Sequence, residues 1–309
     1  MAQIDPKNDP EFAAGCNVCH APLIEQYETL PGEDNDFQRN NSFNPALQKE
    51  GITCAACHMR EGQVFGPARK EERPVNVAGE KSRPSHAGFA EIPLFSKAEF
   101  CAACHQMEDG YAFNGKPLIN TYNEWMESSF AKNGVVCQDC HMPDRRHLWR
   151  GIHDPDMTAS ALTIEASLEG GKARLAIGNT GAGHYFPTYA TPLVEARAYL
   201  AGSDGRMQPG SMRKWRIGRM VSLDISYEKY DTRIPPGEWR EFIYPVKAAK
   251  RGSKIVFEIM VHPDKFYAGF YAHRLDNGAK GKSAALFREA LKKAKRNEYR
   301  LWRKEIPLP

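Results

Sequence analysis

The sequence predicts an α+β fold: a helix- and loop-rich region at residues 1–157, a small antiparallel β-sandwich-like domain at residues 158–275, and a basic C-terminal helix or tail at residues 276–309. Three observations support this division. All eight cysteines lie between Cys16 and Cys140. Long apolar periodic stretches are scarce in the first region, whereas apolar and polar residues alternate in the second, as they do in strands. A chain of 309 residues also exceeds the roughly 250–300 residues at which a single hydrophobic core stops growing.

The first region contains four Cys-x-x-Cys-His motifs, which use all eight cysteines. They are Cys16-Asn-Val-Cys19-His20, Cys54-Ala-Ala-Cys57-His58, Cys101-Ala-Ala-Cys104-His105 and Cys137-Gln-Asp-Cys140-His141. Two thiols three positions apart reach the two vinyl groups at one edge of a porphyrin, and the adjacent histidine points its imidazole at the iron. We therefore predict four covalently bound haem c groups, attached by the eight cysteines and bound at iron by His20, His58, His105 and His141.

Two other chemistries use paired cysteines. Four Cys-x-x-Cys pairs are enough for two four-thiolate zinc sites or for a disulfide framework. Neither requires a histidine after each pair, and only 10 of the 309 residues are histidine. Four such histidines after four pairs therefore strongly favour haem. Four porphyrins also supply apolar mass that this region lacks, so we expect short helices at the attachment sites, joined by long ordered loops.

The group that fills the sixth position of each iron separates an electron carrier from an enzyme. Six histidines lie outside the motifs, and of these we predict four as axial ligands: His86, His147, His153 and His184. His86 lies in a loop with small neighbours at residues 83–89. His184 lies between two glycines and two aromatic residues, which favours delivery of an imidazole to a haem.

His147 and His153 follow the last motif closely. Six residues span at most roughly 20 Å, so we expect both histidines to bind neighbouring haems; the alternative is hydrogen bonding to haem propionates. His262 and His273 are weaker candidates, and His273 also fits a role as ligand to a haem of a neighbouring subunit. Methionine is a further alternative, which would raise the potential of a haem; the candidates are Met59, Met107, Met142 and Met157.

The second region contains alternating segments separated by turns that are rich in Gly and Pro. The predicted strands are residues 162–166, 173–177, 194–199, 240–244 and 254–259. Turn sequences between them favour hairpin or Greek-key connections and a small sandwich. Because this region has no cysteine and no evident catalytic motif, we expect a cap or interaction module. Residues 283–304 are predicted to form a basic amphipathic helix, with Leu286, Leu291 and Trp302 on its apolar side.

The net charge also differs between the two halves of the chain. Residues 1–150 hold 15 Lys and Arg and 21 Asp and Glu, a net charge of −6, whereas residues 151–309 hold 27 and 17, a net charge of +10. This asymmetry fits docking to an anionic partner or to haem propionates; an ordinary solvated surface is an equal alternative. We expect redox partner proteins, with self-association through haem edges as a further option, and no nucleic acid.

The start of the chain lacks the basic and apolar segments of a signal peptide, and no apolar run reaches the about 18–20 residues that span a bilayer. We therefore expect neither a signal peptide nor a transmembrane segment in this chain. Since thioether attachment of haem takes place outside the bacterial cytoplasm, the cofactor predicts a periplasmic or extracellular protein.

The motifs and their surroundings resemble the tetrahaem cytochrome c family typified by the electron acceptor of hydroxylamine oxidation in nitrifying bacteria. The resemblance covers roughly residues 10–190 and rests on the four motifs, the sequences at residues 54–59 and 101–106, the His86 loop and the His147 and His153 pair. It implies mostly bis-His haems, with room for one five-coordinate haem, stacked in near-parallel pairs.

Residues 183–188 and the strand-rich extension depart from that family. This C-terminal part is similar to multihaem cytochromes of extracellular electron transfer, some of whose tetrahaem members polymerise into haem-threaded filaments.

We therefore expect an electron-transfer protein with four mostly bis-His haems, which relays electrons between redox partners in the cell envelope or extracellular space and has no catalytic residues. Two alternatives stay open. One is a redox enzyme with one five-coordinate haem that acts on a small nitrogen or oxygen species. The other is a subunit of a conductive, haem-threaded filament. No nucleotide-binding loop, hydrolase nucleophile motif or HExxH motif occurs in the sequence.

Overall fold

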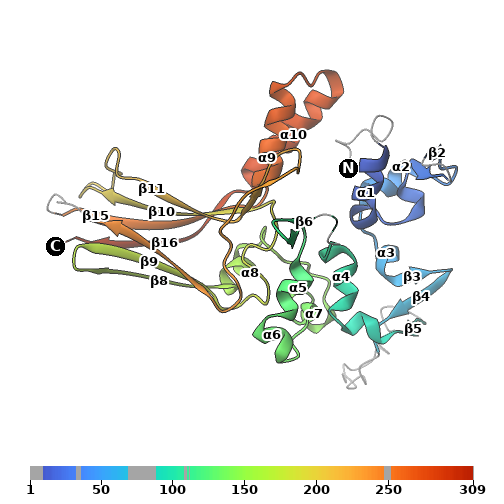
Figure 1. The fold of residues 1–309 in the computed structure, drawn as a ribbon, viewed down its shortest axis with the longest axis horizontal. Coiled ribbons are helices and arrows are strands. Elements are labelled where there is room, and N and C mark those ends of the chain that lie inside the picture. Colours follow the sequence, from blue (N-terminus) through green and yellow to red (C-terminus); the bar gives the residue numbers. More distant parts are fainter. Residues whose placement is uncertain are drawn as a thin grey trace, which may run out of the picture. The chain divides into compact units, whose positions relative to one another are not determined.

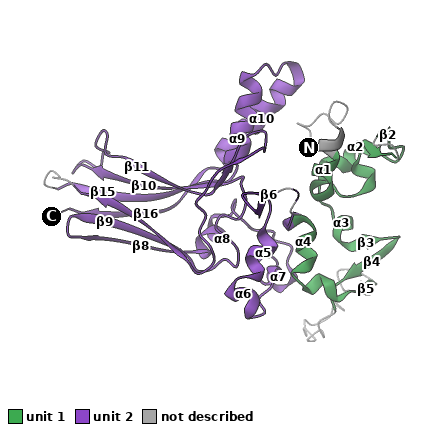
Figure 2. Ribbon diagram, viewed as in Figure 1, with its two compact units in different colours: residues 1–104 green, residues 105–309 purple. Residues whose placement is uncertain are grey.

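The computed structural model describes residues 10–32, 36–68, 88–107, 110, 112–246 and 252–308, and the side chains from residue 14 onward within these ranges. The chain forms two compact units, residues 1–104 and 105–309 (Figures 1 and 2). The boundary falls at the end of helix α4 (Glu99–His105). The domain limits predicted at residues 157 and 275 are finer than this division and stay predictions.

Unit 1 consists of short helices and very short strands joined by loops. Besides most of α4, its helices are α1 (Pro10–His20), α2 (Pro45–Glu50) and α3 (Cys54–His58), with 3-10 turns η1 (Ile24–Gln26) and η2 (Pro93–Ser96). Its strands are β1 (Thr29–Pro31), β2 (Phe37–Arg39), β3 (Met59–Arg60), β4 (Gln63–Gly66) and β5 (Ala90–Glu91). β1 pairs with β2 and β3 with β4 in antiparallel fashion, whereas β4 and β5 are parallel.

Buried amide side chains connect the segments of unit 1. The Gln26 side chain is fully buried and donates to the carbonyl oxygens of Leu47 at 2.9 Å and Gly51 at 2.6 Å. Asn40, also buried, donates to the carbonyl oxygens of Ile24 and Tyr27. Because these bonds join segments that are 13 to 25 residues apart, polar contacts fix the loops around α1 and α2.

Unit 2 begins with a second group of short elements. They are β6 (Ala112–Phe113), β7 (Lys116–Pro117), α5 (Thr121–Met126), α6 (Ser129–Lys132), α7 (Cys137–His141), η4 (Pro143–Arg145) and α8 (Pro155–Ser160). Side-chain caps fix two of these starts: Ser128 accepts from the amide of Ala131, and Asp154 accepts from the amide of Met157. Each cap satisfies an amide that has no partner within its own helix.

The rest of unit 2 is an antiparallel β-sandwich (Figure 1). One sheet has the order β11-β10-β15-β16 and the other β14-β9-β8. The bounds are β8 (Leu162–Glu169), β9 (Lys172–Asn179), β10 (Leu193–Ala201), β11 (Arg213–Ile217), β14 (Trp239–Pro245), β15 (Lys254–His262) and β16 (Tyr299–Pro307), with a separate pair of β12 (Arg219–Val221) and β13 (Glu228–Asp231). All five predicted strands are present, and the α+β class is confirmed.

Both sheets contribute to one apolar core. Leu175 and Ile177 of β9 and Val194 of β10 are fully buried, as are Phe257 and Ile259 of β15. Alternate residues of a strand point to opposite faces, so these side chains form the layer between the sheets. This core depends on protein side chains alone.

The C-terminal region differs from the prediction. A helical hairpin of α9 (Lys265–Asp276) and α10 (Gly281–Arg296) is inserted between β15 and β16 (Figure 1). The helix predicted at residues 283–304 ends at Arg296, so its last part is wrong: Trp302 lies opposite Ile259 in the β15–β16 ladder and packs against the sandwich core. Pairing with β15 makes this segment a strand rather than a helix. Within the described ranges, no helix is both long and apolar enough to cross a membrane.

Candidate haem-binding site

Each Cys-x-x-Cys-His motif ends a helix at its histidine. His20 ends α1, His58 ends α3, His105 ends α4 and His141 ends α7. Residues i, i+3 and i+4 lie on one face of a helix, so the two cysteines and the histidine of a motif project from the same side of a single turn. None of the eight cysteines is buried. The local fold of every motif therefore suits attachment of one flat group through two thiols and one imidazole.

Backbone carbonyls hold two of the motif histidines. The Nδ1 atom of His58 lies 2.7 Å from the carbonyl oxygen of Phe65, and that of His141 lies 2.7 Å from the carbonyl oxygen of Arg150. Such a bond is donated by Nδ1–H and leaves the lone pair on Nε2, which is the usual arrangement of metal-bound histidines. Both rings are therefore oriented for binding a metal through Nε2.

The loop after the fourth motif has an unusual backbone. Asp144, Arg145 and Trp149 have φ values of 55°, 61° and 50°. Side chains other than glycine rarely adopt this left-handed conformation, and such positions gather at functional sites. The loop returns to the motif, where the amide of Trp149 donates to the carbonyl oxygen of His141 at 3.2 Å. The strained turn thus delivers the carbonyl of Arg150 to the imidazole of His141.

His105 has a different partner. Its Nδ1 atom is hydrogen-bonded to the Tyr189 hydroxyl, and the two rings lie 6.0 Å apart at an angle of 26°. Tyr189 was not predicted. It lies 84 residues from His105 in the sequence, and only its position shortly after His184 in an aromatic stretch sets it apart.

The described side chains of residues 14–160 include very few buried apolar groups. The buried hydrophobic residues there are Ala21, Ala56 and Ala98. Larger apolar side chains are exposed instead: Val18, Ile24, Ile52, Met59, Val64, Leu94, Met126, Leu148 and Trp149. Burial of apolar surface is the main driving force of folding. Because this part of the chain buries few apolar side chains of its own, its burial pattern fits a shell around apolar groups that are not side chains.

His184 faces the histidine of the fourth motif. The ring centres of His141 and His184 are 6.4 Å apart, and their planes differ by 15°. Two imidazoles bound to opposite sides of one metal ion, with bonds of about 2 Å, have ring centres roughly 6 Å apart. The Nδ1 atom of His184 lies 3.0 Å from the carbonyl oxygen of Tyr185, which leaves Nε2 for a metal. The pair therefore has the spacing of two axial ligands of one iron.

The electrostatic environment keeps His184 neutral. Burial lowers the pKa of His184 to about 4, and the electrostatic effects of His141, His105 and Arg233 act in the same direction, against the hydrogen bond that its Nδ1–H donates to the Tyr185 carbonyl oxygen. An imidazole binds a metal in its neutral form. His184 is therefore in the state that ligation needs at neutral pH.

Close backbone packing positions the loop that carries His184. A Cβ atom at Gly181 would lie 2.0 Å from the carbonyl oxygen of Ser160, and one at Gly183 would lie 3.2 Å from Trp125. The fully buried Asn179 donates to the carbonyl oxygen of His184 at 2.8 Å. The two glycines before His184 therefore permit tight contact with the neighbouring backbone and side chains.

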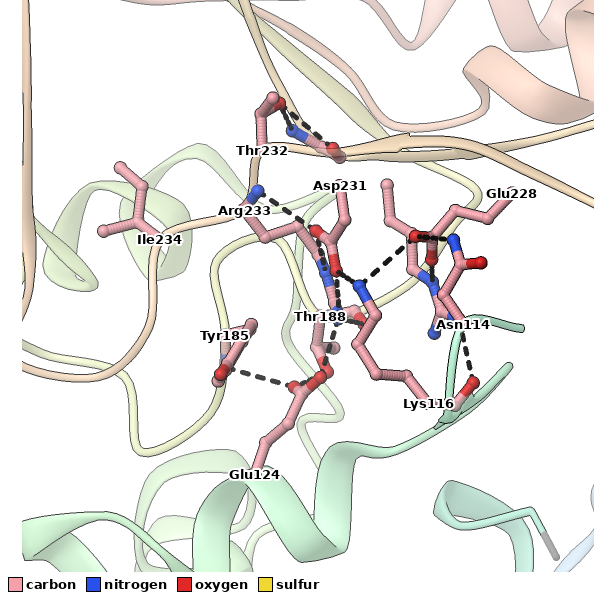
Figure 3. Close-up of polar contacts among 12 residues, drawn as sticks. Asn114, Lys116, Glu124, Tyr185, Thr188, Glu228, Asp231, Thr232, Arg233 and Ile234 are labelled. Atoms are coloured by element: carbon pink, nitrogen blue, oxygen red, sulfur yellow. Dashed lines mark hydrogen bonds and ion pairs between the residues drawn. The ribbon is translucent and has the colours of Figure 1, made fainter. Parts of the chain in front are cut away.

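A buried polar network lies behind this loop (Figure 3). The Glu124 carboxylate of α5 accepts from the Tyr185 amide at 3.1 Å, from the Thr188 hydroxyl at 2.9 Å and from Arg233 at 2.7 Å. Arg233 also donates to Asp231 at 2.9 Å. The Glu124 and Arg233 side chains are 2% and 1% exposed. No local sequence pattern indicates this network, because its members are up to 109 residues apart.

The other predicted ligands are placed as follows. His86 lies outside the described residues. His147 is exposed, with its ring centre 6.0 Å from that of Trp149. The Nε2 atom of His153 lies 3.0 Å from the Asp264 carboxylate, a contact that iron binding through Nε2 would replace. Ligation by His86, His147 and His153 stays a prediction.

The weaker candidates have partners of their own. His262 is buried with its Nδ1 atom 3.1 Å from the Glu298 carboxylate, and Nδ1 of His273 lies 3.0 Å from the Asn277 side-chain nitrogen. Neither histidine faces a motif histidine in these contacts.

The zinc alternative is poorly supported by the donor geometry. In the part of the chain that the structure describes, no three His, Cys, Asp or Glu side chains converge so as to hold a metal ion. Burial raises the pKa of the thiols of Cys57 and Cys140, and burial together with the neighbouring Cys19 raises that of Cys104 to about 11. Zinc must displace the thiol proton to bind a thiolate, so a raised pKa weakens zinc binding at these cysteines.

Comparison with known proteins gives similarities in sequence and in fold. The chain is 22% identical over 174 residues to the multiheme cytochrome MtrA of Shewanella baltica (strain OS185), an alignment that covers 55% of this chain and 47% of that protein. Its fold is similar to the crystal structure of a penta-heme cytochrome c552 from Thermochromatium tepidum, with a TM-score of 0.60, 17% identity, and coverage of 95% of this chain and 83% of that one. The chain is similar to multihaem c-type cytochromes.

These similarities point to a broader group of proteins than the expected resemblance does. The chain spans about half the length of the curated relative it matches, and no protein-family model matches the sequence. The multihaem part of the expected resemblance is supported; the tetrahaem type of nitrifying bacteria stays an expectation.

Proposed function

We propose that this chain is a c-type cytochrome that transfers electrons through four covalently attached haem groups. The eight motif cysteines form the thioether bonds, and His20, His58, His105 and His141 are the proximal iron ligands. Bound haem supplies one-electron redox chemistry. The chain attaches the haems, orients their axial imidazoles through Nδ1 hydrogen bonds, and shields them from water.

The facing pair of His141 and His184 carries the electron-transfer assignment. An iron with an imidazole on both sides has no open position for a substrate, so it relays electrons and performs no further reaction. The 6.4 Å spacing of the two rings supports such a closed site at the fourth motif. A carrier is therefore favoured over an enzyme with an open haem.

The apolar composition supports four haems rather than fewer. Exposed large apolar side chains occur near each of the motifs: Val18 beside the first, Met59 beside the second, Leu94 before the third, and Leu148 and Trp149 after the fourth. Each is a surface that an attached porphyrin would cover, which favours occupancy of all four motifs.

The proposed location and partners follow from the cofactor and the charge. Thioether attachment places the protein in the periplasm or outside the cell, where it exchanges electrons with other redox proteins. The helical hairpin of α9 and α10 presents nine exposed Lys and Arg residues against two Asp and Glu residues. Such a surface favours docking to an acidic partner and accelerates encounter at low ionic strength.

The test is a haem count on protein matured in a periplasm that has a cytochrome c maturation system. We expect the intact mass and the pyridine haemochrome absorbance to give four haems per chain. Replacing both cysteines of one motif, for example Cys137→Ala with Cys140→Ala, lowers the count by one. A wild-type count below four, or bound zinc in place of haem, contradicts the proposal.

A further inference from the structure

The buried ion pair of Glu124 and Arg233 attaches no haem, yet it contacts the loop that carries His184 at two positions after that residue. Directly after His184, the amide of Tyr185 donates to Glu124 at 3.1 Å. Four residues after His184, Thr188 donates its hydroxyl to Glu124 and accepts at its carbonyl oxygen from Arg233 at 2.7 Å. The Tyr185 ring lies under the Arg233 guanidinium, 4.9 Å from ring centre to Cζ.

The ion pair is anchored in parts of unit 2 on either side of the loop. Glu124 belongs to α5, and Arg233 follows β13, where it is fixed by two hydrogen bonds to Asp231 at 2.9 and 3.0 Å. Lys116 donates to Oδ2 of Asp231 at 2.6 Å, the oxygen that also accepts from Nη2 of Arg233 (Figure 3). A segment bound by such a network has few alternative positions, because moving it would leave buried charges without partners.

The opposite end of the loop is fixed by different means. Asn179 holds the carbonyl oxygen of His184 at 2.8 Å, and Gly181 packs directly on Ser160. The backbone on both sides of His184 is thus fixed. On the side after it, the amide of Tyr185 donates to the Glu124 carboxylate. The orientation of the imidazole therefore depends on Glu124.

We infer that Glu124 and Arg233 are positioning residues that hold the His184 imidazole opposite His141, and so keep the fourth iron six-coordinate. This inference rests on the proposed function, since it concerns the axial ligand of an attached haem. The ion pair decides whether the fourth site is closed, as in a carrier, or open to a small molecule, as in an enzyme. The ion pair acts through the loop, because the hydrogen bonds of Glu124 and Arg233 given above reach Tyr185 and Thr188 rather than His141 or His184.

The test compares ferric holoprotein variants by electron paramagnetic resonance, which separates high-spin from low-spin haem. His184→Ala removes the proposed ligand and is expected to turn one haem of the set high-spin. Glu124→Ala leaves His184 in place but removes its support, and is expected to give the same high-spin signal in a substantial fraction of molecules. Added imidazole is expected to restore the low-spin state in both variants.

Glu124→Gln is the conservative variant. Its amide oxygen still accepts from Tyr185 and Thr188, so we expect most of the low-spin signal to return. If Glu124→Ala does not accumulate as holoprotein, Thr188→Val takes its place, because it removes the hydroxyl that joins the loop to Glu124: altered g-values or a partial high-spin signal from one haem support the inference, and a wild-type spectrum overturns it.

Glu228→Gln is the matched control. Glu228 forms an equally buried ion pair with Arg219, at 2.7 Å and with side chains 5% and 0% exposed, but Arg219 donates to the carbonyl oxygens of residues 116–118 rather than to the His184 loop. We expect it to lower stability and leave every haem low-spin. A high-spin signal as large as that of Glu124→Ala would mean that the effect comes from a general loss of stability. This result would overturn the inference.

The outcomes separate the two proposals. If His184→Ala gives a high-spin haem and Glu124→Ala does not, the positioning role is overturned and the proposed function stands. If His184→Ala leaves all haems low-spin, the pairing of His184 with His141 fails, and the closed site behind the proposed function fails with it.

Discussion

Unit 1 and the β-sandwich of unit 2 are stabilised in opposite ways. The sandwich buries Leu175, Ile177, Phe257 and Ile259 completely between two sheets. Among its described residues, unit 1 buries alanines and the polar side chains of Gln26 and Asn40, while several of its larger apolar residues are exposed. The difference shows how one chain combines a core of its own side chains with a region that depends on attached groups. The predictions below test this contrast, from the largest expected effect to the smallest.

The largest effect is expected on withholding haem. If the chain is produced in the cytoplasm without thioether attachment, unit 1 should lose its fixed structure, because few side chains are available to bury. Hydrogen exchange should then show near-complete loss of protection in the described residues of unit 1, while β9, β10 and β15 stay protected. Equal protection of unit 1 with and without haem would contradict the contrast; the haem-loaded protein is the control.

The second effect concerns the sandwich core. Phe257→Ala should lower the free energy of unfolding of the sandwich by about 3–5 kcal/mol, since the side chain is fully buried and leaves a cavity. Denaturant unfolding followed by the fluorescence of the sandwich tryptophans measures this loss. The haem count should stay at four, because the core makes no use of haem. A fall in the haem count that matches the loss of stability would break the separation between the two regions.

The matched control for this substitution is Ile243→Ala. Ile243 lies on β14 of the same sandwich but is 43% exposed. Its loss should change the free energy of unfolding by no more than about 0.5 kcal/mol.

The third effect lies where the sandwich meets the loop of His184. Gly181→Ala places a methyl group 2.0 Å from the Ser160 carbonyl oxygen, so the backbone must shift, at a cost of about 1–3 kcal/mol. A visible absorption or paramagnetic resonance change at one haem should accompany the loss of stability. Gly151→Ala is the control, because a Cβ atom there meets nothing within 4 Å. Identical spectra for the wild type and Gly181→Ala would show that the loop absorbs the shift.

The smallest effect is expected at the surface of the sandwich. Arg174 of β9 forms an exposed ion pair with Glu241 of β14. Exposed pairs contribute about 0–1 kcal/mol, so Arg174→Ala should barely move the urea midpoint. A loss above about 2 kcal/mol would contradict the view that the stability of the sandwich comes from its apolar core.

Local sequence patterns predicted local features. The four motif helices and the five strands follow from spacing and alternation within a few residues, and the structure contains all of them. The helix prediction is wrong at residues 299–304, which belong to β16, because the partner strand β15 decides the conformation of this segment. An isolated sequence window does not contain that partner.

The site was predicted only in part, because it also depends on residues that are distant in the sequence. His184 was expected as a ligand from its own glycine and aromatic neighbours, but nothing in the sequence joined it to His141, which lies 43 positions earlier. Tyr189, Glu124 and Arg233 were missed entirely. Their roles arise from contacts across 61 to 109 residues, and each alone is an ordinary tyrosine, glutamate or arginine.

The helical hairpin inserted between β15 and β16 also sets an order of events during synthesis. Neighbouring antiparallel strands are usually joined by a few residues, but here residues 263–298 separate them. Because β16 follows every other strand in the chain, the four-stranded sheet is completed only after residue 299 has left the ribosome. All four motifs have been made by residue 141. The four-stranded sheet is therefore completed later in synthesis than any of the four motifs.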